Sequence, residues 1–197
     1  MLKAAVLVSG GGTNLQALLD AEAAGHIPHA KISLVIASRP DAYALTRAQK
    51  AGVPAEVVRR KDFACAEDFD TALLDALHRH DIDVVVLAGF LSILGKRVID
   101  AYPDRILNIH PSLIPSFCGE GFYGLKVHEA ALAKGVKVTG ATVHLVNEVT
   151  DGGRILLQKA VEVLPDDTPE TLQRRVMEQA EWKLLPEALE LLCSGSI

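Results

Sequence analysis

The 197-residue chain predicts an α/β fold, an open and mostly parallel twisted sheet of about seven strands with helices on both faces. Apolar runs rich in Val and Ile alternate with helix-patterned segments, which is the pattern of βαβ units. These runs are continuously apolar rather than alternating, as expected of strands that are buried on both faces. Hydrophobic residues make up 49% and charged residues 23%, a composition that supports a packed core and argues against disorder.

The first half of the chain is expected to contain four strands and three helices. Continuous apolar runs predict strands at 4–9, 31–38, 55–59 and 83–89. Leu and Ala at helical spacing predict the intervening helices at 14–25, 42–52 and 67–80. The first two helices close on Gly25 and Gly52, because glycine readily takes the conformation that ends a helix.

The second half departs from this rhythm. The expected order is a strand at 105–111, a long loop at 112–124, a helix at 125–135, strands at 139–148 and 155–164, and a helix at 168–192. The last strands flank a short turn, so this end of the sheet is expected to be partly antiparallel. Thr168 is a candidate N-cap followed by Pro169, and Pro186 is expected to kink or interrupt the last helix near 183–185.

The bulk composition limits the class of partner. The net charge is −5 and no run of Lys and Arg occurs, which argues against nucleic acid or an anionic membrane. Cys65, Cys118 and Cys193 lie far apart without a C-x-x-C motif, so neither a disulfide framework nor a metal site is indicated. The first strand-like run begins at Lys3 and is too short to span a bilayer, so a cytoplasmic protein without a signal peptide is expected.

A glycine-rich turn, SGGGTN at 9–14, lies between the first strand and the first helix. Its glycines allow the backbone to approach a ligand closely, and the free N–H groups at the helix start favour a phosphate. The turn is neither a G-x-G-x-x-G motif nor a Walker loop, and the alternative is an ordinary capped turn. By itself the turn leaves both interpretations open.

Two further strand ends carry candidate chemistry. In LAGFLSILG (87–95), a Gly followed by apolar residues could offer backbone groups to a flat, partly apolar ring, or could simply be a core strand entering a hydrophobic turn. In LNIHPS (107–112), Asn108 and His110 share one side of a strand that stops at Pro111. Taken alone, these two side chains are better explained as satisfied polar groups at a strand end.

Other polar residues depend on what they face. TDGGR (150–154) is an Asp-Gly turn signal, and a functional Asp151 would need to face His110. His144 lies on a strand whose polar face could line the same cleft. His128 follows helical spacing next to an acidic residue and is expected at the surface.

Five stretches occur in an order typical of one enzyme family: VLVSGGGTNLQALLDA, VVLAGFLSIL, ILNIHPSLIPSF, GATVHLV and DGGRILLQ. Over about residues 3–190 the chain resembles the phosphoribosylglycinamide formyltransferases, folate-dependent enzymes of purine biosynthesis. Asn-x-His-Pro-Ser is shared across the wider formyltransferase superfamily, and Ser-Gly-x-Gly-Thr-Asn narrows the resemblance to the glycinamide ribonucleotide enzymes. The resemblance implies a Rossmann-like formyltransferase fold. It also implies transfer of the formyl group of 10-formyltetrahydrofolate to N1-(5-phospho-ribosyl)glycinamide, without a metal.

The resemblance further implies roles for named residues. Catalysis is implied for Asn108, His110 and Asp151. Substrate binding is implied for Gly11, Gly12, Thr13, Asn14 and Glu181. Folate binding is implied for Leu91, Ser92, Ile93, Leu94, Asn108, Asn147, Glu148, Val149 and Thr150. Glu181 would contact the substrate near its amine. Ala66 stands where some family members carry a basic residue that touches the folate, which is a departure from the pattern.

The residue types suit this chemistry. Formyl transfer to an amine passes through a tetrahedral intermediate with an oxyanion, which needs hydrogen-bond donors and a route for the amine proton. Asn108 can donate an N–H to the oxyanion, and a protonated His110 can donate a second bond. Asp151 is expected to raise the pKa of His110, and it could accept the amine proton directly or through water.

Three other functions share parts of this pattern. Methionyl-tRNA formyltransferase should carry a further C-terminal domain and a basic surface, and formyltetrahydrofolate deformylase an N-terminal regulatory domain. A non-catalytic folate- or nucleotide-binding module is disfavoured by the intact catalytic trio. We expect one domain over 1–197, with a phosphate-binding half at 1–100 and a catalytic and folate-binding half at 101–197. The expected partners are small-molecule substrates, with neither nucleic acid nor membrane, for a monomer or weak homodimer.

Overall fold

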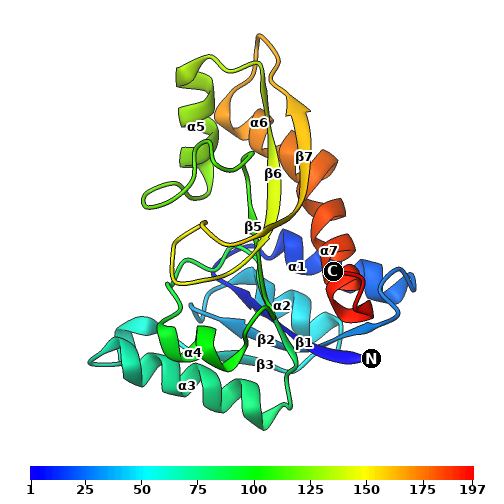
Figure 1. Ribbon diagram of the computed structural model, residues 1–197, viewed down its shortest axis with the longest axis vertical. Helices are drawn as coiled ribbons and strands as arrows, with labels where there is room; N and C mark the ends of the chain where they lie inside the picture. The colour runs from blue at the N-terminus through cyan, green and yellow to red at the C-terminus, as the bar shows by residue number, and fades with distance from the viewer.

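A computed structural model describes residues 1–197 and contains one seven-stranded sheet (Figure 1). The strands are β1 (Leu2–Val8), β2 (Ala30–Ala37), β3 (Ala55–Val57), β4 (Val84–Leu87), β5 (Ile106–His110), β6 (Val138–Leu145) and β7 (Ile155–Glu162). Their spatial order is β3-β2-β1-β4-β5-β6-β7. The first five pair in parallel, whereas β6 pairs antiparallel with both β5 and β7. The predicted fold class is therefore confirmed, including the antiparallel end of the sheet.

Helices connect and cover the strands. The α-helices are α1 (Thr13–Ala23), α2 (Tyr43–Lys50), α3 (Ala66–Arg79), α4 (Lys96–Ala101), α5 (Leu125–Lys134), α6 (Pro169–Val176) and α7 (Trp182–Ser194). A short 3-10 helix (Arg60–Asp62) precedes α3, and a π-helical turn (Met177–Glu181) joins α6 to α7.

Successive side chains of β1 pack into two separate apolar layers. Ala4, Val6 and Val8 belong to the layer that includes residues of α1, α2 and α7. Ala5 and Leu7 belong to the layer that includes residues of α3 and α4, which lie together at the lower end of Figure 1. Because β1 is buried on both faces from Ala4 to Val8, every position in that part of it is apolar, which explains the continuous run in the sequence.

The strand order reverses between β1 and β4, which is the point where open parallel sheets commonly bind ligands. Ser9, directly after β1, joins the two loops that diverge there. Its N–H donates to the carbonyl oxygen of Gly89 (3.1 Å), and its hydroxyl accepts the N–H of Leu91 (2.9 Å). The two predicted ligand-binding loops therefore meet at one residue.

Helix α4 has no counterpart among the elements that the sequence predicts. Its six residues are too few to show helical periodicity, so tertiary contacts determine it. Val98 is buried in the layer that α3 covers. The buried Asp70 of α3 accepts the N–H of the N-cap residue Gly95 at 3.0 Å.

The last helical segment is interrupted at a different place from the predicted one. Pro186 lies inside α7, which continues to Ser194, and the break is the π-helical turn Met177–Glu181. The helix is therefore not interrupted at 183–185, and its irregular turn lies ahead of the proline. The start of α6 is confirmed: Thr168 caps it, and Thr171 completes the capping box.

His128 is buried, and the prediction that it lies at the surface is wrong. Its side chain is on the inner face of α5 with Ala131, three residues along, and both residues are fully buried. Neither ring nitrogen of His128 has a hydrogen-bond partner. Burial, with a smaller contribution from nearby His110, lowers the pKa of His128 to about 4.

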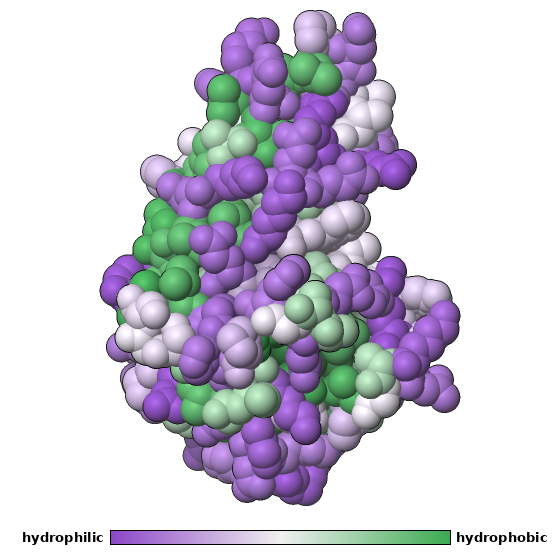
Figure 2. Space-filling view, turned by 90° about the vertical axis from the view of Figure 1, so that its right-hand side faces the viewer, coloured by the Kyte–Doolittle hydropathy of each residue, from purple (hydrophilic) through white to green (hydrophobic).

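The surface in Figure 2 is mostly hydrophilic, with a notch between the part built on β6 and β7 and the rest of the molecule. No helix combines the length and the apolar character needed to cross a lipid bilayer.

We expect His128 to make the fold acid-sensitive. Its pKa is about 4 in the folded chain and about 6.5 in an unfolded chain, so the unfolded chain binds the proton first as the pH falls. The free energy of unfolding should therefore decrease between pH 6.5 and pH 4, by up to about 3 kcal/mol from this residue. Urea unfolding of the wild-type protein and the His128→Gln variant at several pH values in this range measures that contribution.

The difference in the free energy of unfolding between wild type and His128→Gln isolates the contribution of His128. Buried Glu181, whose pKa is raised to about 7, stabilises the folded chain as the pH falls, but it does so equally in both proteins. The matched control is His78→Gln, which removes an exposed histidine of α3. An equal pH dependence in wild type and His128→Gln would contradict the prediction.

Candidate active site

Antiparallel pairing of β5 with β6 brings an amide and two imidazoles together. The register places Asn108 opposite His144 and His110 opposite Thr142. Asp151 lies in the turn after β6, in the left-handed conformation with φ of 54°. Its carboxylate oxygens lie 3.6 Å from Nδ1 of His110 and 3.5 Å from Nε2 of His144. The structure therefore brings all three predicted catalytic side chains together.

The proton of neutral His110 is placed by a backbone contact. Its Nε2 lies 2.9 Å from the carbonyl oxygen of Phe117, which can only accept, so Nε2 carries the hydrogen and Nδ1 faces Asp151. Burial lowers the pKa of His110, and this outweighs the Phe117 carbonyl and the Asp151 carboxylate, which both raise it. Asp151 thus acts in the predicted direction, while burial makes the net shift of the His110 pKa downward.

Asp151 remains ionised although it is largely buried. Burial raises the pKa of its carboxyl group, but the contact with His144, the N–H of Gly119 at 2.8 Å and the nearby imidazole of His110 together outweigh burial. The pKa of Asp151 therefore lies below its ordinary value. An ionised carboxylate in this position can accept a proton but cannot donate one.

Asn108 is oriented by its neighbours. Its Nδ2 lies 3.0 Å from Nε2 of His144 and 3.5 Å from Oδ1 of Asp151. Nδ1 of His144 lies 2.8 Å from the carbonyl oxygen of Leu145 and donates to it, so in the neutral ring Nε2 accepts from Asn108. The contact with Asp151 is at the limit of hydrogen bonding, and this N–H is available to a better acceptor.

The 112–124 loop covers these residues. Phe117 accepts the hydrogen bond of His110 and Gly119 donates to Asp151, which leaves the two catalytic side chains only 6% and 9% exposed. Phe117 has a φ of 49°, a conformation that costs a non-glycine residue about 1–3 kcal/mol. A substrate oxygen can bond Nε2 of His110 only by replacing the Phe117 carbonyl.

The predicted phosphate turn is open at the start of α1. Gly12 is the N-cap, with φ of 70°, and no side chain caps the helix. The first turn of α1 carries no acidic residue, so its free N–H groups and positive dipole end are available to an anion. Gly12 also contacts α2, since a Cβ at this position would lie 2.6 Å from the Cβ of Ala44.

Asn14 and Glu181, far apart in the sequence, form one buried pair. Asn14 Nδ2 donates to Glu181 Oε2 at 2.7 Å, while Asn14 Oδ1 has no partner. The π-helical turn Met177–Glu181 directs Glu181 inward, and such turns are frequent at functional sites. Burial raises the pKa of Glu181 to about 7, partly offset by the bond from Asn14. The two predicted substrate residues therefore act as a unit.

The predicted folate segment Leu91–Leu94 is anchored at both ends. The Ser9 hydroxyl accepts the N–H of Leu91, and Asp70 accepts the N–H of Gly95 directly after the segment. Between the anchors, Leu91 and Ile93 are 59% and 78% exposed, whereas Leu94 is buried and Ser92 half-buried. Exposed apolar side chains on a fixed backbone suit a flat, partly apolar ring.

The second predicted folate segment, Asn147–Thr150, lies next to the first. Asn147 Oδ1 accepts the N–H of Val149 at 2.9 Å, which shapes the turn and leaves the Val149 side chain 64% exposed. Glu148 forms an ion pair of 2.7 Å with Lys96 at the start of α4. This contact ties the second segment to the start of α4, two residues after the first segment, and both segments present exposed apolar side chains.

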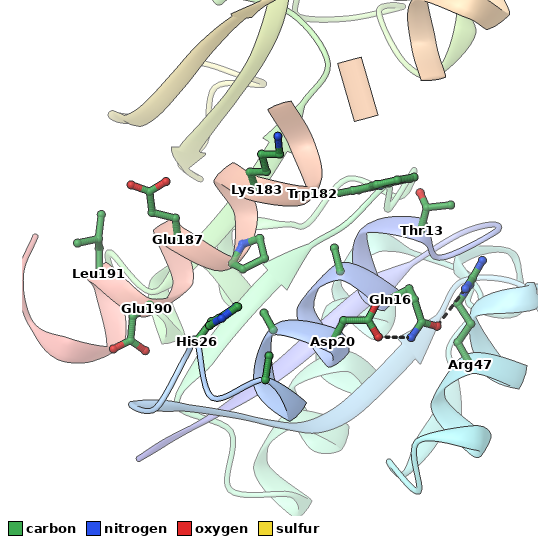
Figure 3. Close-up of a pocket in the computed structure, with 14 residues that line it drawn as sticks. Thr13, Gln16, Asp20, His26, Arg47, Trp182, Lys183, Glu187, Glu190 and Leu191 are labelled. Atoms are coloured by element: carbon green, nitrogen blue, oxygen red, sulfur yellow. Dashed lines mark hydrogen bonds between the residues drawn. The ribbon is translucent and has the colours of Figure 1, made fainter. Parts of the chain in front are cut away.

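A cavity of about 740 Å³ lies between α1 and α7 (Figure 3). Thr13, Gln16 and Arg47 lie at one end of it, and His26 and Glu190 lie toward the other. None of the predicted catalytic residues Asn108, His110 and Asp151 lines this cavity. The cavity instead continues the predicted phosphate turn.

Sequence reasoning missed four residues that support the site: Ser9, Asp70, Phe117 and Gly119. Three of them act through backbone groups or a small hydroxyl, and no sequence motif marks such contacts. Asp70 could have been found, since it is an acidic residue on the apolar face of α3. A buried carboxylate at such a position requires a partner.

The family model described as formyl transferase matches residues 2–189. The chain is 41% identical over 197 residues to phosphoribosylglycinamide formyltransferase of Haemophilus influenzae, covering 100% of this chain and 90% of that protein. It is 43% identical over 195 residues to the human trifunctional purine biosynthetic protein adenosine-3, covering 99% of this chain but only 19% of that longer protein.

The fold is also shared with solved structures. The crystal structure of glycinamide ribonucleotide transformylase 1 from Symbiobacterium toebii superposes with a TM-score of 0.93 at 44% identity, over 99% of this chain and 89% of that one. The Brucella melitensis phosphoribosylglycinamide formyltransferase gives a TM-score of 0.88 at 43% identity, over 100% and 97% of the two chains.

The contact between Gly12 and Ala44 predicts a position-specific effect of substitution. Gly12→Ala should lower the free energy of unfolding by about 1–3 kcal/mol, because the new Cβ meets α2 and the left-handed φ is strained for alanine. Gly10→Ala is the matched control, since a Cβ there has nothing within 4 Å and should change stability by about 0.5 kcal/mol or less. Chemical denaturation measures both, and equal effects would contradict the close contact.

Proposed function

The chain belongs to the phosphoribosylglycinamide formyltransferase family of formyl transferases, and we propose that Asn108, His110 and Asp151 carry its transfer reaction. The enzyme acts on small-molecule substrates in purine biosynthesis. In the proposed reaction, the formyl group of 10-formyltetrahydrofolate passes to the amine of N1-(5-phospho-ribosyl)glycinamide. The observation that carries this assignment is the convergence of the trio at the end of β5.

Asn108 and His110 supply the donors that this reaction needs. Attack of the substrate amine on the formyl carbon forms a C–N bond and leaves negative charge on the formyl oxygen. Asn108 has an N–H whose contact with Asp151, at 3.5 Å, is too long for a good hydrogen bond, so it can donate to the formyl oxygen instead. The Nε2–H of His110 can donate a second hydrogen bond to the same oxygen. As the charge grows, the bond from His110 Nε2–H to the formyl oxygen strengthens, and Asp151, 3.6 Å from Nδ1, stabilises the positive charge that this bond draws onto the ring.

Asp151 supplies the proton route. Its carboxylate is ionised and accepts the proton that the attacking amine loses, directly or through water. That proton is then delivered to N10 of the folate as the bond between the formyl carbon and N10 breaks, giving tetrahydrofolate. The protons and bonds balance without an oxidant, reductant or metal.

The remaining predicted residues bind the two substrates. We assign the ribonucleotide to the half formed by 1–100, with Gly11, Gly12, Thr13 and Asn14 at its phosphate end and Glu181 from the other half beside Asn14. We assign the folate ring to Leu91–Leu94 and Asn147–Thr150, whose exposed apolar side chains fit it. The protein is proposed to work in the cytoplasm as a monomer or weak homodimer.

Formyl transfer is tested by incubating the protein with glycinamide ribonucleotide and 10-formyltetrahydrofolate and following tetrahydrofolate release. Release should require the ribonucleotide and should yield the N-formyl product in equal amount. Release at the same rate without the ribonucleotide would identify a hydrolase instead.

Substitution of the trio should reduce turnover more than binding. His110→Ala and Asp151→Asn should each lower kcat about 10²–10³-fold with a much smaller change in KM, because the lost groups act on charge that develops in the transition state. Steady-state kinetics with both substrates measure this. Exposed residues of α3 provide matched controls, His78→Ala and Asp75→Asn, and both should retain normal turnover. Near-normal kcat in either trio variant would refute its proposed role.

A further inference from the structure

One ion pair links the 147–150 turn to the rest of the site. The carbonyl oxygen of Val149 accepts the N–H of Gly152 at 2.9 Å, so the turn closes on itself. The only hydrogen bond or ion pair that joins the turn to a helix or strand is donated by Nζ of Lys96 to Oε1 of Glu148, at 2.7 Å. The place of the turn relative to the other proposed folate segment therefore depends on Lys96.

Lys96 belongs to a fixed part of the molecule. It is the first residue of α4 and follows Gly95, whose N–H is held by the buried carboxylate of Asp70 at 3.0 Å. Val98, two residues further on, is fully buried. Because the backbone of Lys96 is held on both sides, its ion pair fixes the turn rather than the helix.

A second carboxylate directs the ammonium group of Lys96. Nζ also lies 2.9 Å from Oδ1 of Asp100, one turn further along α4. Contact with Asp100 restricts the lysine side chain, so less conformational entropy is lost when it pairs with Glu148. The pair is solvent-exposed, at 67% for Lys96 and 61% for Glu148, and such pairs add little to the stability of a whole fold. Its effect is therefore expected on the position of one short turn.

The ion pair lies next to exposed apolar side chains on both segments. Val149 directly follows Glu148, and Leu91 and Ile93 lie a few residues before Lys96. A flat, partly apolar ring that packs on both segments removes these side chains from water. Such packing requires the turn to stand at a set distance from Leu91–Leu94, and the ion pair supplies that spacing.

We propose that Lys96 is a positioning residue for the folate, which holds the 147–150 turn beside Leu91–Leu94 through its ion pair with Glu148. The inference rests on the proposed function, in which both segments bind the folate ring. It assigns a role to a residue of α4 that touches neither substrate. Because the turn is already in place when the ring arrives, less freedom is lost on binding.

Calorimetric titration with tetrahydrofolate and steady-state kinetics test this in Lys96→Met, Glu148→Gln and the double variant. Each single variant should raise the Kd for tetrahydrofolate and the KM for 10-formyltetrahydrofolate about two- to fivefold, as loss of an exposed ion pair does. The kcat and the KM for the ribonucleotide should not change, because the contact is present throughout the reaction. The double variant should equal either single one, since the same contact is lost only once. Lys96→Arg should retain wild-type folate binding.

Two other roles for Lys96 predict different results. If its ammonium group bound a carboxylate of the folate directly, Glu148→Gln would free the lysine and tighten folate binding. If Lys96 only stabilised α4, Lys96→Met would be impaired whereas Glu148→Gln would be normal. Either result, additive losses in the double variant, or unchanged folate binding in both single variants would overturn the proposal.

Arg79→Met is the matched control for loss of an exposed ion pair. It breaks the contact with Glu56 of β3, at the other edge of the sheet, and should leave every constant unchanged. The titration measures folate binding without turnover. Failure of the wild-type protein to transfer formyl groups while it binds tetrahydrofolate would therefore count against the proposed reaction and not against the role of Lys96.

Discussion

The buried carboxylate of Asp151 is the interaction on which the catalytic end of the molecule depends. It receives the N–H of Gly119 from the 112–124 loop and the amide of Asn108 from β5, and it faces both His110 and His144. Four separate pieces of chain thus meet at one negative charge. Burial opposes that charge, and only the combined donors keep the pKa of Asp151 below its ordinary value. Burial lowers the pKa of His110 against the effect of Asp151, and the Phe117 carbonyl oxygen fixes a proton on its Nε2.

The reversal of strand order between β1 and β4 gives the rest of the site its layout. The glycine turn and the Leu91–Leu94 segment leave the sheet at adjacent strands, and Ser9 bonds to the backbone of the second loop. The proposed anion subsite and the proposed ring subsite therefore follow neighbouring strands, β1 and β4, and Asn108 and His110 lie on the next strand, β5. Glu181 comes from the far end of the chain, so the anion subsite also needs the C-terminal helices. The pair Asn14–Glu181 therefore needs residues from both halves of the chain.

Much of the fold could be predicted because most elements are long enough to show their periodicity. The four parallel strands of the first half, the Gly135 helix end and the Thr168 cap all follow from local preferences. Helix α4 was missed because its six residues are too few to show the periodicity of apolar residues that marks a helix. The burial of His128 and the π turn at Met177–Glu181 were missed because each depends on what packs against the helix. The effect of Asp151 on the pKa of His110 has the predicted direction, whereas the larger and opposite effect of burial could not be read from the sequence.

The sequence by itself determined the fold class, the order of the strands along the chain and the identity of the candidate catalytic residues. Alternation along β5 placed Asn108 and His110 on one face, and this is a local property of an extended chain. Only the tertiary structure decided that Asp151 reaches His110, that Asn14 is bonded to Glu181, and that α2 holds the glycine turn. These contacts join residues 36 to 167 positions apart. Their geometry depends on how the sheet closes and how the helices pack on it, which no local pattern encodes.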